Sequence, residues 1–295
     1  MAESPKEIRK RIKSVTSTKK ITKTMELVAT SKMKRAQDRV QAAGPYTAKL
    51  QEIINAIASG GPLDLPLLQP RSQVKNVALV VMTANRGLCG GFNANLIKMA
   101  KLEHKAQKDQ GRGVQLHCVG KKGLGTLRFQ GYDITRSIVD KPDKPTFDDA
   151  RRVTDPLVEA FLKGEIDEVL VVYPHWMSVG SQPPTVKKLL PIEPPKVQAD
   201  KAGSGKKGNL DFIFSPSANE ILSDLLPRYV TQSMYTMLVM SFAGEQVARR
   251  TAMKSATDNA QEMITHLTRT LNRARQAQIT QEIAEIVGGA AALKK

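Results

Sequence analysis

A glycine-rich turn at residues 86–93 (RGLCGGFN) carries the residue types best suited to binding a phosphate. It follows an expected strand and precedes an expected helix, where a dinucleotide-binding protein holds the phosphate with backbone NH groups and the helix N-terminus. However, Gly87, Gly90 and Gly91 do not have the G-x-G-x-x-G spacing. Val119-Gly120 also stands where an acid would bind the ribose. The sequence therefore favours a structural turn over a nucleotide site.

The other candidate sites lack the spacing that their chemistry requires. Residues 120–126 (GKKGLGT) and 203–208 (GSGKKG) resemble parts of a Walker loop, but neither has GxxxxGK followed by Ser or Thr. The histidines show no metal-ligand spacing with another His, Cys or acid; they are His104, His117, His175 and His266. Cys89 and Cys118 form neither a disulfide framework nor a zinc pattern. The sequence thus predicts no catalytic residue, no cofactor and no metal.

The N-terminal part of the chain is predicted to be one long helix from Pro5 to about Ala58. Ser4 and Glu7 form an N-terminal capping signature around Pro5. Small or apolar residues then recur mostly at alternating steps of three and four, the period of a coiled coil. They are Ile8, Ile12, Val15, Thr18, Thr22, Met25, Ala29, Ala36, Val40 and Ala43. Such a thin stripe favours packing against one slim partner.

A second, longer helix is predicted from about residue 217 to residue 287. Pro227 is expected to kink or restart it, and Gly288-Gly289 to stop it. Its apolar positions include Leu222, Leu225, Tyr229, Met234, Met237, Leu238, Val247, Ala248, Met253, Met263, Ile264, Leu267, Leu271, Ala274, Ile279, Ile283 and Ile286. At 1.5 Å per residue this helix would span roughly 105 Å, whereas a compact chain of this length has a radius of gyration of about 19 Å. The helix must therefore project, and the N-terminal helix is its available partner in an antiparallel coiled coil.

The middle of the chain reads as alternating strands and helices. Strands are expected at 74–83, 114–119, 167–173, 185–192 and 210–214, and helices at 93–107, 121–129 and 146–162. Continuous Val/Leu runs separated by helices favour a mainly parallel, Rossmann-like α/β sheet. Pro194-Pro195 and residues 203–208 are expected to form a surface excursion. We predict three parts: an N-terminal coiled-coil helix at 1–59, a globular domain at 74–214 and a C-terminal coiled-coil helix at 215–295.

The charge of the chain points to an acidic partner. Its 295 residues carry a formal net charge of +17, which fits nucleic acid, an anionic membrane surface or acidic protein loops. Between Lys6 and Arg39, 12 Lys/Arg face only three acids. No run approaches the ~20 apolar residues of a membrane helix, and the basic N-terminus lacks the apolar stretch of a secretory signal. We expect a soluble protein that keeps its N-terminus.

Three stretches resemble one known family. Residues 6–33 (KEIRKRIKSVTSTKKITKTMELVATSKM) are similar to the N-terminal signature of the ATP synthase gamma subunits. Residues 249–293 (RRTAMKSATDNAQEMITHLTRTLNRARQAQITQEIAEIVGGAAAL) are similar to the C-terminal signature of that family. Residues 86–93 resemble its short Gly-Cys-Gly-Gly-Phe-Asn segment. The resemblance therefore spans the chain.

The resemblance implies a fold and a role. The fold is an antiparallel coiled coil of the two termini plus a Rossmann-like domain. The role is that of a central-stalk rotor without catalytic residues, placed in a hexamer of alternating alpha and beta subunits. Its other implied partners are the epsilon subunit and the membrane-embedded c-ring. The implied location is peripheral, on the cytoplasmic side of a bacterial inner membrane.

The resemblance also assigns residues. Arg275 and Gln276 match the Arg-Gln pair that touches an acidic catch loop of beta, and Thr280 and Glu282 lie in the same matched stretch. Met25 matches a methionine beside that contact on the N-terminal helix. Ser215 stands before Pro216, where family members commonly carry a glutamate, so the implied ring contact differs there.

Two other interpretations remain open from the sequence. The basic N-terminal helix fits a coiled-coil protein that binds nucleic acid, which predicts affinity that falls steeply with salt. Few aromatic residues are available for base stacking, however. A Rossmann-type nucleotide enzyme would need a phosphate loop and a ribose-binding acid, and neither is present.

Overall fold

The structure is a computed structural model that describes residues 4–58, 65–140, 144–192 and 218–292. Its contacts group into two compact units. Unit 1 comprises Met1–Ser31 with Arg249–Lys295, and unit 2 comprises Lys32–Ala248. Helices α1 (Pro5–Ala58) and α5 (Ala218–Ala292) contribute to both units. The predicted domain boundaries at 59, 74, 214 and 215 stay predictions, because the two units divide the long helices rather than ending with them.

Unit 2 contains a five-stranded sheet, which confirms the predicted mainly parallel α/β class. The strands are β1 (Asn76–Met82), β2 (Gly113–Val119), β3 (Arg136–Ile138), β4 (Glu168–Pro174) and β5 (Pro184–Leu190), in the spatial order β3-β2-β1-β4-β5. Strands β1 to β4 pair in parallel, and β5 pairs antiparallel with β4. β3 was not predicted, because this strand has only three residues, two of them exposed, and therefore shows no apolar run in the sequence.

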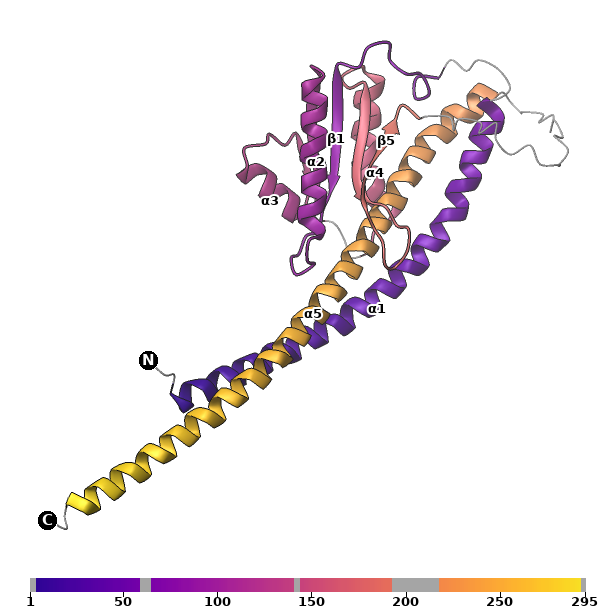
Figure 1. Ribbon diagram of the computed structural model, residues 1–295. Coiled ribbons are helices and arrows are strands. Elements are labelled where there is room, and N and C mark those ends of the chain that lie inside the picture. Colours follow the sequence, from indigo (N-terminus) through magenta and orange to yellow (C-terminus); the bar gives the residue numbers. More distant parts are fainter. Residues whose placement is uncertain (1–3, 59–64, 141–143, 193–217, 293–295) are drawn as a thin grey trace, which may run out of the picture. The chain divides into compact units, whose positions relative to one another are not determined.

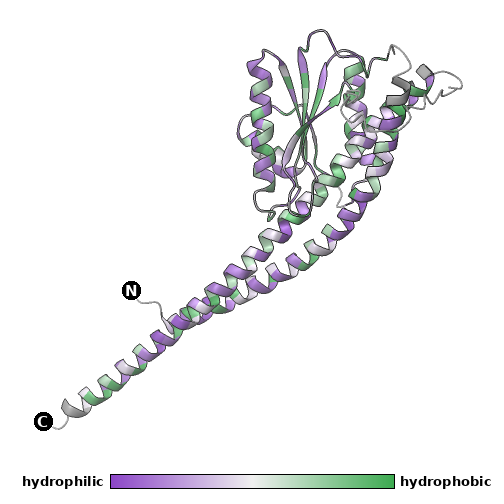
Figure 2. Ribbon diagram, turned by 45° about the vertical axis from the view of Figure 1, so that its right-hand side comes forward, coloured by the Kyte–Doolittle hydropathy of each residue, from purple (hydrophilic) through white to green (hydrophobic). Residues whose placement is uncertain are grey.

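Helices cover both faces of this sheet, as a buried parallel sheet requires. Because side chains alternate along a strand, Val77, Leu79 and Val81 of β1 pack with α2 (Phe92–Asp109) and α3 (Lys121–Phe129). Ala78, Val80 and Met82 pack with α4 (Phe147–Leu162) and with the unit 2 parts of α1 and α5. In Figure 2 the strands are accordingly hydrophobic along much of their length.

A glycine allows α3 to approach the end of the sheet closely. A Cβ atom added to Gly123 would lie 2.7 Å from the Thr83 hydroxyl oxygen and 2.8 Å from Cys118 Sγ. Because glycine has no side chain, its backbone comes close enough for the Gly123 NH to donate to the Thr83 hydroxyl at 2.9 Å. Gly120, at φ +107° at the end of β2, also leaves no room for a side chain, because an added Cβ atom would clash with the Thr83 carbonyl oxygen. Gly120 and Gly123 of the 120–126 segment therefore have structural reasons to be there.

In unit 1, α1 and α5 run antiparallel, as predicted (Figure 1). Lys19 donates to Gln261, and the Thr257 hydroxyl donates to the Thr22 hydroxyl at 2.8 Å. The capping box also forms, since the backbone NH of Glu7 donates to Ser4 Oγ and that of Ser4 to the Glu7 carboxylate. The buried interface residues of this unit are few and mostly small or flexible: Ile8, Ala29, Met253, Thr257, Ala260 and Leu267.

The predicted restart of α5 at Pro227 and its predicted stop at Gly288-Gly289 were wrong, whereas a kink at Pro227 stays a prediction. The helix continues through Pro227, because the buried side chains of Leu226, Tyr229 and Val230 pack on the core and outweigh a proline cost of about 3 kcal/mol. It also continues past Gly288-Gly289 to Ala292, because each glycine costs only about 1 kcal/mol and three alanines follow.

Several predicted features lie outside the described residues. They are the strand at 210–214, Pro194-Pro195, the segment 203–208 and Ser215. Among the described residues, no helix is both long and apolar enough to cross a membrane. The same residues contain no group of three or more His, Cys, Asp or Glu side chains arranged to hold a metal ion.

Candidate functional site

Unit 1 holds a groove where the start of α1 lies beside residues 275–282 of α5. The groove has a volume of about 580 Å³. Its lining comes from Ser4, Pro5, Lys6 and Arg9 on one side and from Arg275, Gln278, Ile279 and Glu282 on the other. The antiparallel register explains why these two sets of residues lie together. Because Thr22 of α1 pairs with Thr257 of α5, the first residues of α1 lie close to residues 275–279 of α5.

The groove carries more positive than negative charge. Lys6, Arg9 and Arg275 face a single acid, Glu282, whose carboxylate accepts a hydrogen bond from Gln278 at 2.9 Å. Arg275 is exposed and forms no ion pair with any described residue. The N–H donors of its planar guanidinium are therefore available to a carboxylate of another chain.

The structure brings only some of the predicted site residues together. Arg275 and Glu282 share the groove, since residues seven apart lie on one face of a helix. Gln276 and Thr280 are exposed but do not line it, and the Thr280 hydroxyl donates to the Gln276 carbonyl at 2.9 Å. These two residues therefore lie on a different face of α5.

Met25 lies at a separate position on the coiled coil. It is partly buried and sits three residues after Thr22, which pairs with Thr257. Arg275 lies 18 residues beyond Thr257, or about 27 Å along a helix. The structure thus does not bring Met25 to the Arg275 groove, and the contacts of both residues with a partner stay predictions.

Lys6 and Arg9 are groove residues that sequence reasoning counted only as part of a basic helix. The capping signature at Ser4 could have indicated their role, because it marks the start of α1. In an antiparallel pair, the start of α1 must lie beside the C-terminal part of α5. Fixing the register from sequence requires knowing which small residues meet. The Thr22–Thr257 contact supplies that information only in the structure.

Beyond the groove, α5 has no helical partner within the described residues. Every residue from Arg275 to Gly289 is exposed. This stretch includes Ile283, Ile286 and Val287, at 56%, 72% and 63% exposure. In Figures 1 and 2 this end of α5 runs past the first turn of α1. The predicted apolar stripe therefore contains buried residues up to Leu267, although Met263 is half exposed, and it is open from Ile279 onward, because α1 has ended.

The glycine-rich turn has the bonding of a structural turn. Asn93 accepts from the Ala84 backbone NH at 2.9 Å and donates to Cys89 Sγ at 3.2 Å. The Phe92 backbone NH donates to the Cys89 carbonyl at 3.2 Å. Leu88 and Gly90 adopt φ values of 61° and 54° that close the turn. Part of the polar backbone that a phosphate would need is thus already bonded within the chain.

Sequence comparisons identify close relatives over the whole chain. The family model described as ATP synthase matches residues 4–293. The ATP synthase gamma chain of Gemmatimonas aurantiaca is 49% identical over 290 residues, covering 98% of each chain. That of Pelotomaculum thermopropionicum is 43% identical over 293 residues, covering 99% of each.

Solved structures share the fold at lower identity. A chain of the Euglena gracilis mitochondrial ATP synthase F1/c-ring assembly matches with a TM-score of 0.68 and 19% identity, covering 98% of this chain and 94% of its own. A chain of the Tetrahymena thermophila central stalk and c-ring matches with a TM-score of 0.58 and 23% identity, covering 80% and 99%. These likenesses confirm the predicted combination of coiled coil and Rossmann-like sheet.

Proposed function

The chain belongs to the ATP synthase gamma chain family, and on that premise we propose that it is the central-stalk rotor of an F-type ATP synthase. In this role it turns with the c-ring, to which it is joined beside the epsilon subunit. The coiled-coil end turns inside the hexamer of alpha and beta subunits and drives the catalytic beta sites through successive conformations. The nucleic-acid interpretation finds no support among the relatives, which are ATP synthase gamma chains.

The unpartnered end of α5 is the observation that carries this proposal. A single helix with apolar side chains exposed on it, such as Ile283 and Ile286, needs a surrounding surface to cover them. A collar of other subunits supplies that surface without a fixed partner helix. Because the helix is not symmetric, the collar meets a different face at each rotor angle.

The rotor itself is proposed to perform no chemistry. The bonding inside the 86–93 turn and the structural roles of Gly120 and Gly123 support this view. ATP is made in the beta subunits, and this chain needs no cofactor or metal for its part. Its proposed location is peripheral to the cytoplasmic face of a bacterial inner membrane, held there by the c-ring.

Arg275 is the residue proposed to sense rotor angle. Its unpaired guanidinium offers a bidentate fork to the acidic catch loop of beta. Charge-assisted bonds of this kind contribute on the order of 1.5–3 kcal/mol where partly shielded from water. Formed at one angle and broken at others, they gate rotation rather than stabilise the fold. Gln276, Thr280 and Glu282 are proposed as neighbouring partner contacts, and Met25 as a separate partner contact further along the coiled coil.

The test is a set of purified mutant complexes with normal subunit composition. Arg275→Ala should impair steady-state ATP hydrolysis and ATP-driven proton pumping. Arg275→Lys should rescue only partly, because an ammonium lacks the fork. Arg273→Ala is the matched control, since Arg273 is exposed on the same helix but does not line the groove. Wild-type rates in Arg275→Ala would remove the residue from the mechanism, and failure to assemble would make its role structural.

A further inference from the structure

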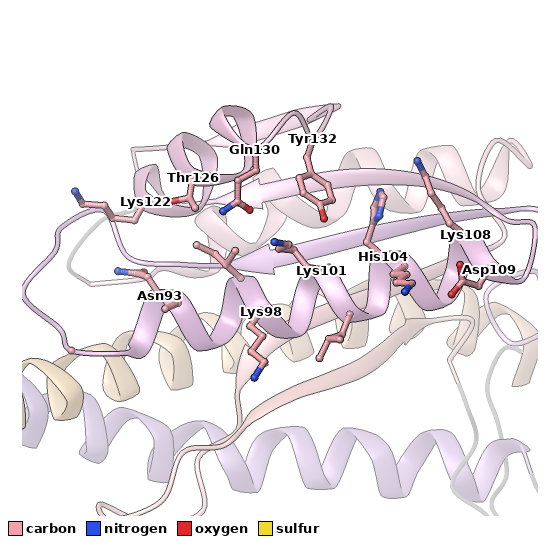
Figure 3. Close-up of a pocket in the computed structure, with 15 residues that line it drawn as sticks. Asn93, Lys98, Lys101, His104, Lys108, Asp109, Lys122, Thr126, Gln130 and Tyr132 are labelled. Atoms are coloured by element: carbon pink, nitrogen blue, oxygen red, sulfur yellow. The ribbon is translucent and has the colours of Figure 1, made fainter.

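We propose that a groove between α2 and α3 binds an acidic, partly apolar segment of a partner polypeptide. The groove has a volume of about 840 Å³ and lies wholly within unit 2 (Figure 3). None of its residues belongs to the coiled-coil end to which the rotary contacts are assigned. The inference therefore adds a further interaction surface to the chain and does not depend on Arg275.

The charge of the groove identifies the sign of its occupant. Five lysines line it, and a single acid, Asp109, opposes them. Four of the lysines follow α2 at steps of three, four and three residues, and Lys122 comes from α3; the four are Lys98, Lys101, Lys105 and Lys108. Across the described part of the chain, none of the five takes part in an ion pair. An excess of unneutralised positive charge in a concave surface attracts an anion.

The length of the groove favours a chain segment over a small anion. Its lining follows α2 from Asn93 to Asp109, a rise of about 24 Å at 1.5 Å per residue. A phosphate or a mononucleotide would fill only part of that length. A peptide of about 16 residues in helical form would match it.

Apolar and aromatic groups lie among the lysines. Ile97 and Leu102 line the groove, and the Leu102 side chain is 56% exposed. In Figure 3 Tyr132 points toward α2 from the opposite side. Its ring lies 6.0 Å from Lys101 Nζ and meets the His104 ring edge-on at 5.1 Å. This mixture fits a segment that carries both carboxylates and apolar side chains.

Other anionic partners fit the groove less well. Single-stranded nucleic acid binds through several stacked bases, whereas Tyr132 is the one Phe, Tyr or Trp side chain among the lining residues. A flat lipid surface would not reach side chains inside a concave groove. An acidic polypeptide segment satisfies the charge, the length and the apolar content together.

His104 provides a reporter inside the groove. Burial and, after it, the positive charge of Lys108 lower the pKa of the His104 imidazole from its usual value. A carboxylate bound beside this ring favours the protonated form and offsets the effect of the Lys108 charge. Occupation by an acidic segment should therefore raise the pKa of His104.

The experiment measures binding of a labelled peptide to the full chain. The probe is a fluorescein-labelled helix-forming peptide of about 16 residues with Glu and Leu on one face, and its control carries Gln in place of Glu. Reversing two groove charges, in Lys101→Glu/Lys108→Glu, should weaken binding by about tenfold or more. Lys121→Glu is the matched control, because Lys121 is exposed at the start of α3 but outside the groove; it should change binding by less than about twofold.

A second readout separates groove binding from general charge attraction. The NMR titration of His104 should shift to higher pH with the Glu peptide and stay unchanged with the Gln peptide. Circular dichroism of each variant confirms that it is folded. Equal binding of the two peptides would overturn the proposal, as would an unchanged His104 titration. Tighter binding of a single-stranded DNA or of phosphatidylglycerol vesicles at the same lysines would also overturn it, by assigning the groove to another class of partner.

Discussion

A disulfide between α1 and α5 tests the register of the coiled coil. The hydroxyl oxygens of Thr22 and Thr257 are 2.8 Å apart, and sulfur atoms in their place need to close only to about 2.0 Å. We therefore expect Thr22→Cys/Thr257→Cys to form an intramolecular disulfide under mild oxidation. Native Cys89 and Cys118 are buried and should not compete.

The bond should stabilise the chain because it closes a very long loop. With about 236 residues in the loop, the chain-entropy relation gives an upper limit of about 5 kcal/mol. Loss of the Thr–Thr hydrogen bond offsets about 1 kcal/mol of this. A net gain of only half the remainder would raise the melting temperature by about 3 °C for a chain of this size.

The assay compares gel mobility without reductant and the melting temperature with and without reductant. Thr16→Cys/Thr257→Cys is the control, because Thr16 lies about 9 Å further along α1, beyond the Cα separation that a disulfide spans. Crosslinking of the control as readily as the 22/257 pair would refute the register. Absence of any crosslink in the 22/257 pair would refute the pairing of the helices.

Two further predictions concern unit 2. Gly123→Ala should lower the free energy of unfolding, measured by urea titration, by about 1–3 kcal/mol, because the added methyl group meets Thr83 at 2.7 Å. Gly125 is on the same helix but has no atom within 4 Å of an added Cβ atom, so Gly125→Ala should be neutral or stabilising. Equal losses of stability in the two variants would contradict the close approach of α3 to the sheet. Burial and, to a lesser extent, the charge of Arg136 lower the pKa of His117 from 6.5 to about 4. The imidazole of His117 therefore binds a proton more readily in the unfolded chain than in the folded one. The free energy of unfolding should consequently fall by about 2 kcal/mol from pH 7 to pH 5. Urea titrations at the two pH values should show a smaller fall in His117→Gln, and an identical fall would exclude this residue as the cause.

Elements with continuous patterns were predictable from the sequence. β1 and β4 are buried apolar runs, and α3 begins and ends at the predicted residues, 121 and 129. The predicted start of α1 is confirmed, because the Ser4–Glu7 capping box is a local interaction that involves only four consecutive residues. The sequence could place these elements because their causes are local.

Features that depend on tertiary packing were harder to predict. The cost of Pro227 in a helix is local, but the burial of Leu226 and Val230 that outweighs it is not. The groove between α2 and α3 needs the sheet order to bring Tyr132 beside α2, although its lysines are visible in the sequence. The predicted partner contacts of Arg275 and Met25 came from family resemblance alone, and the chain's own structure separates the two residues.

Rotation of this chain against the alpha–beta hexamer is the central claim, and a single-molecule measurement tests it most directly. Because Cys89 and Cys118 are buried, a Phe129→Cys variant, changed where the side chain is 92% exposed, can be labelled selectively with a gold nanoparticle. The purified complex is fixed to glass through its beta subunits and supplied with ATP. The particle should turn stepwise in one direction while ATP is hydrolysed. A particle that stays still relative to the hexamer, in complexes that hydrolyse ATP at the normal rate, would contradict rotation of this chain.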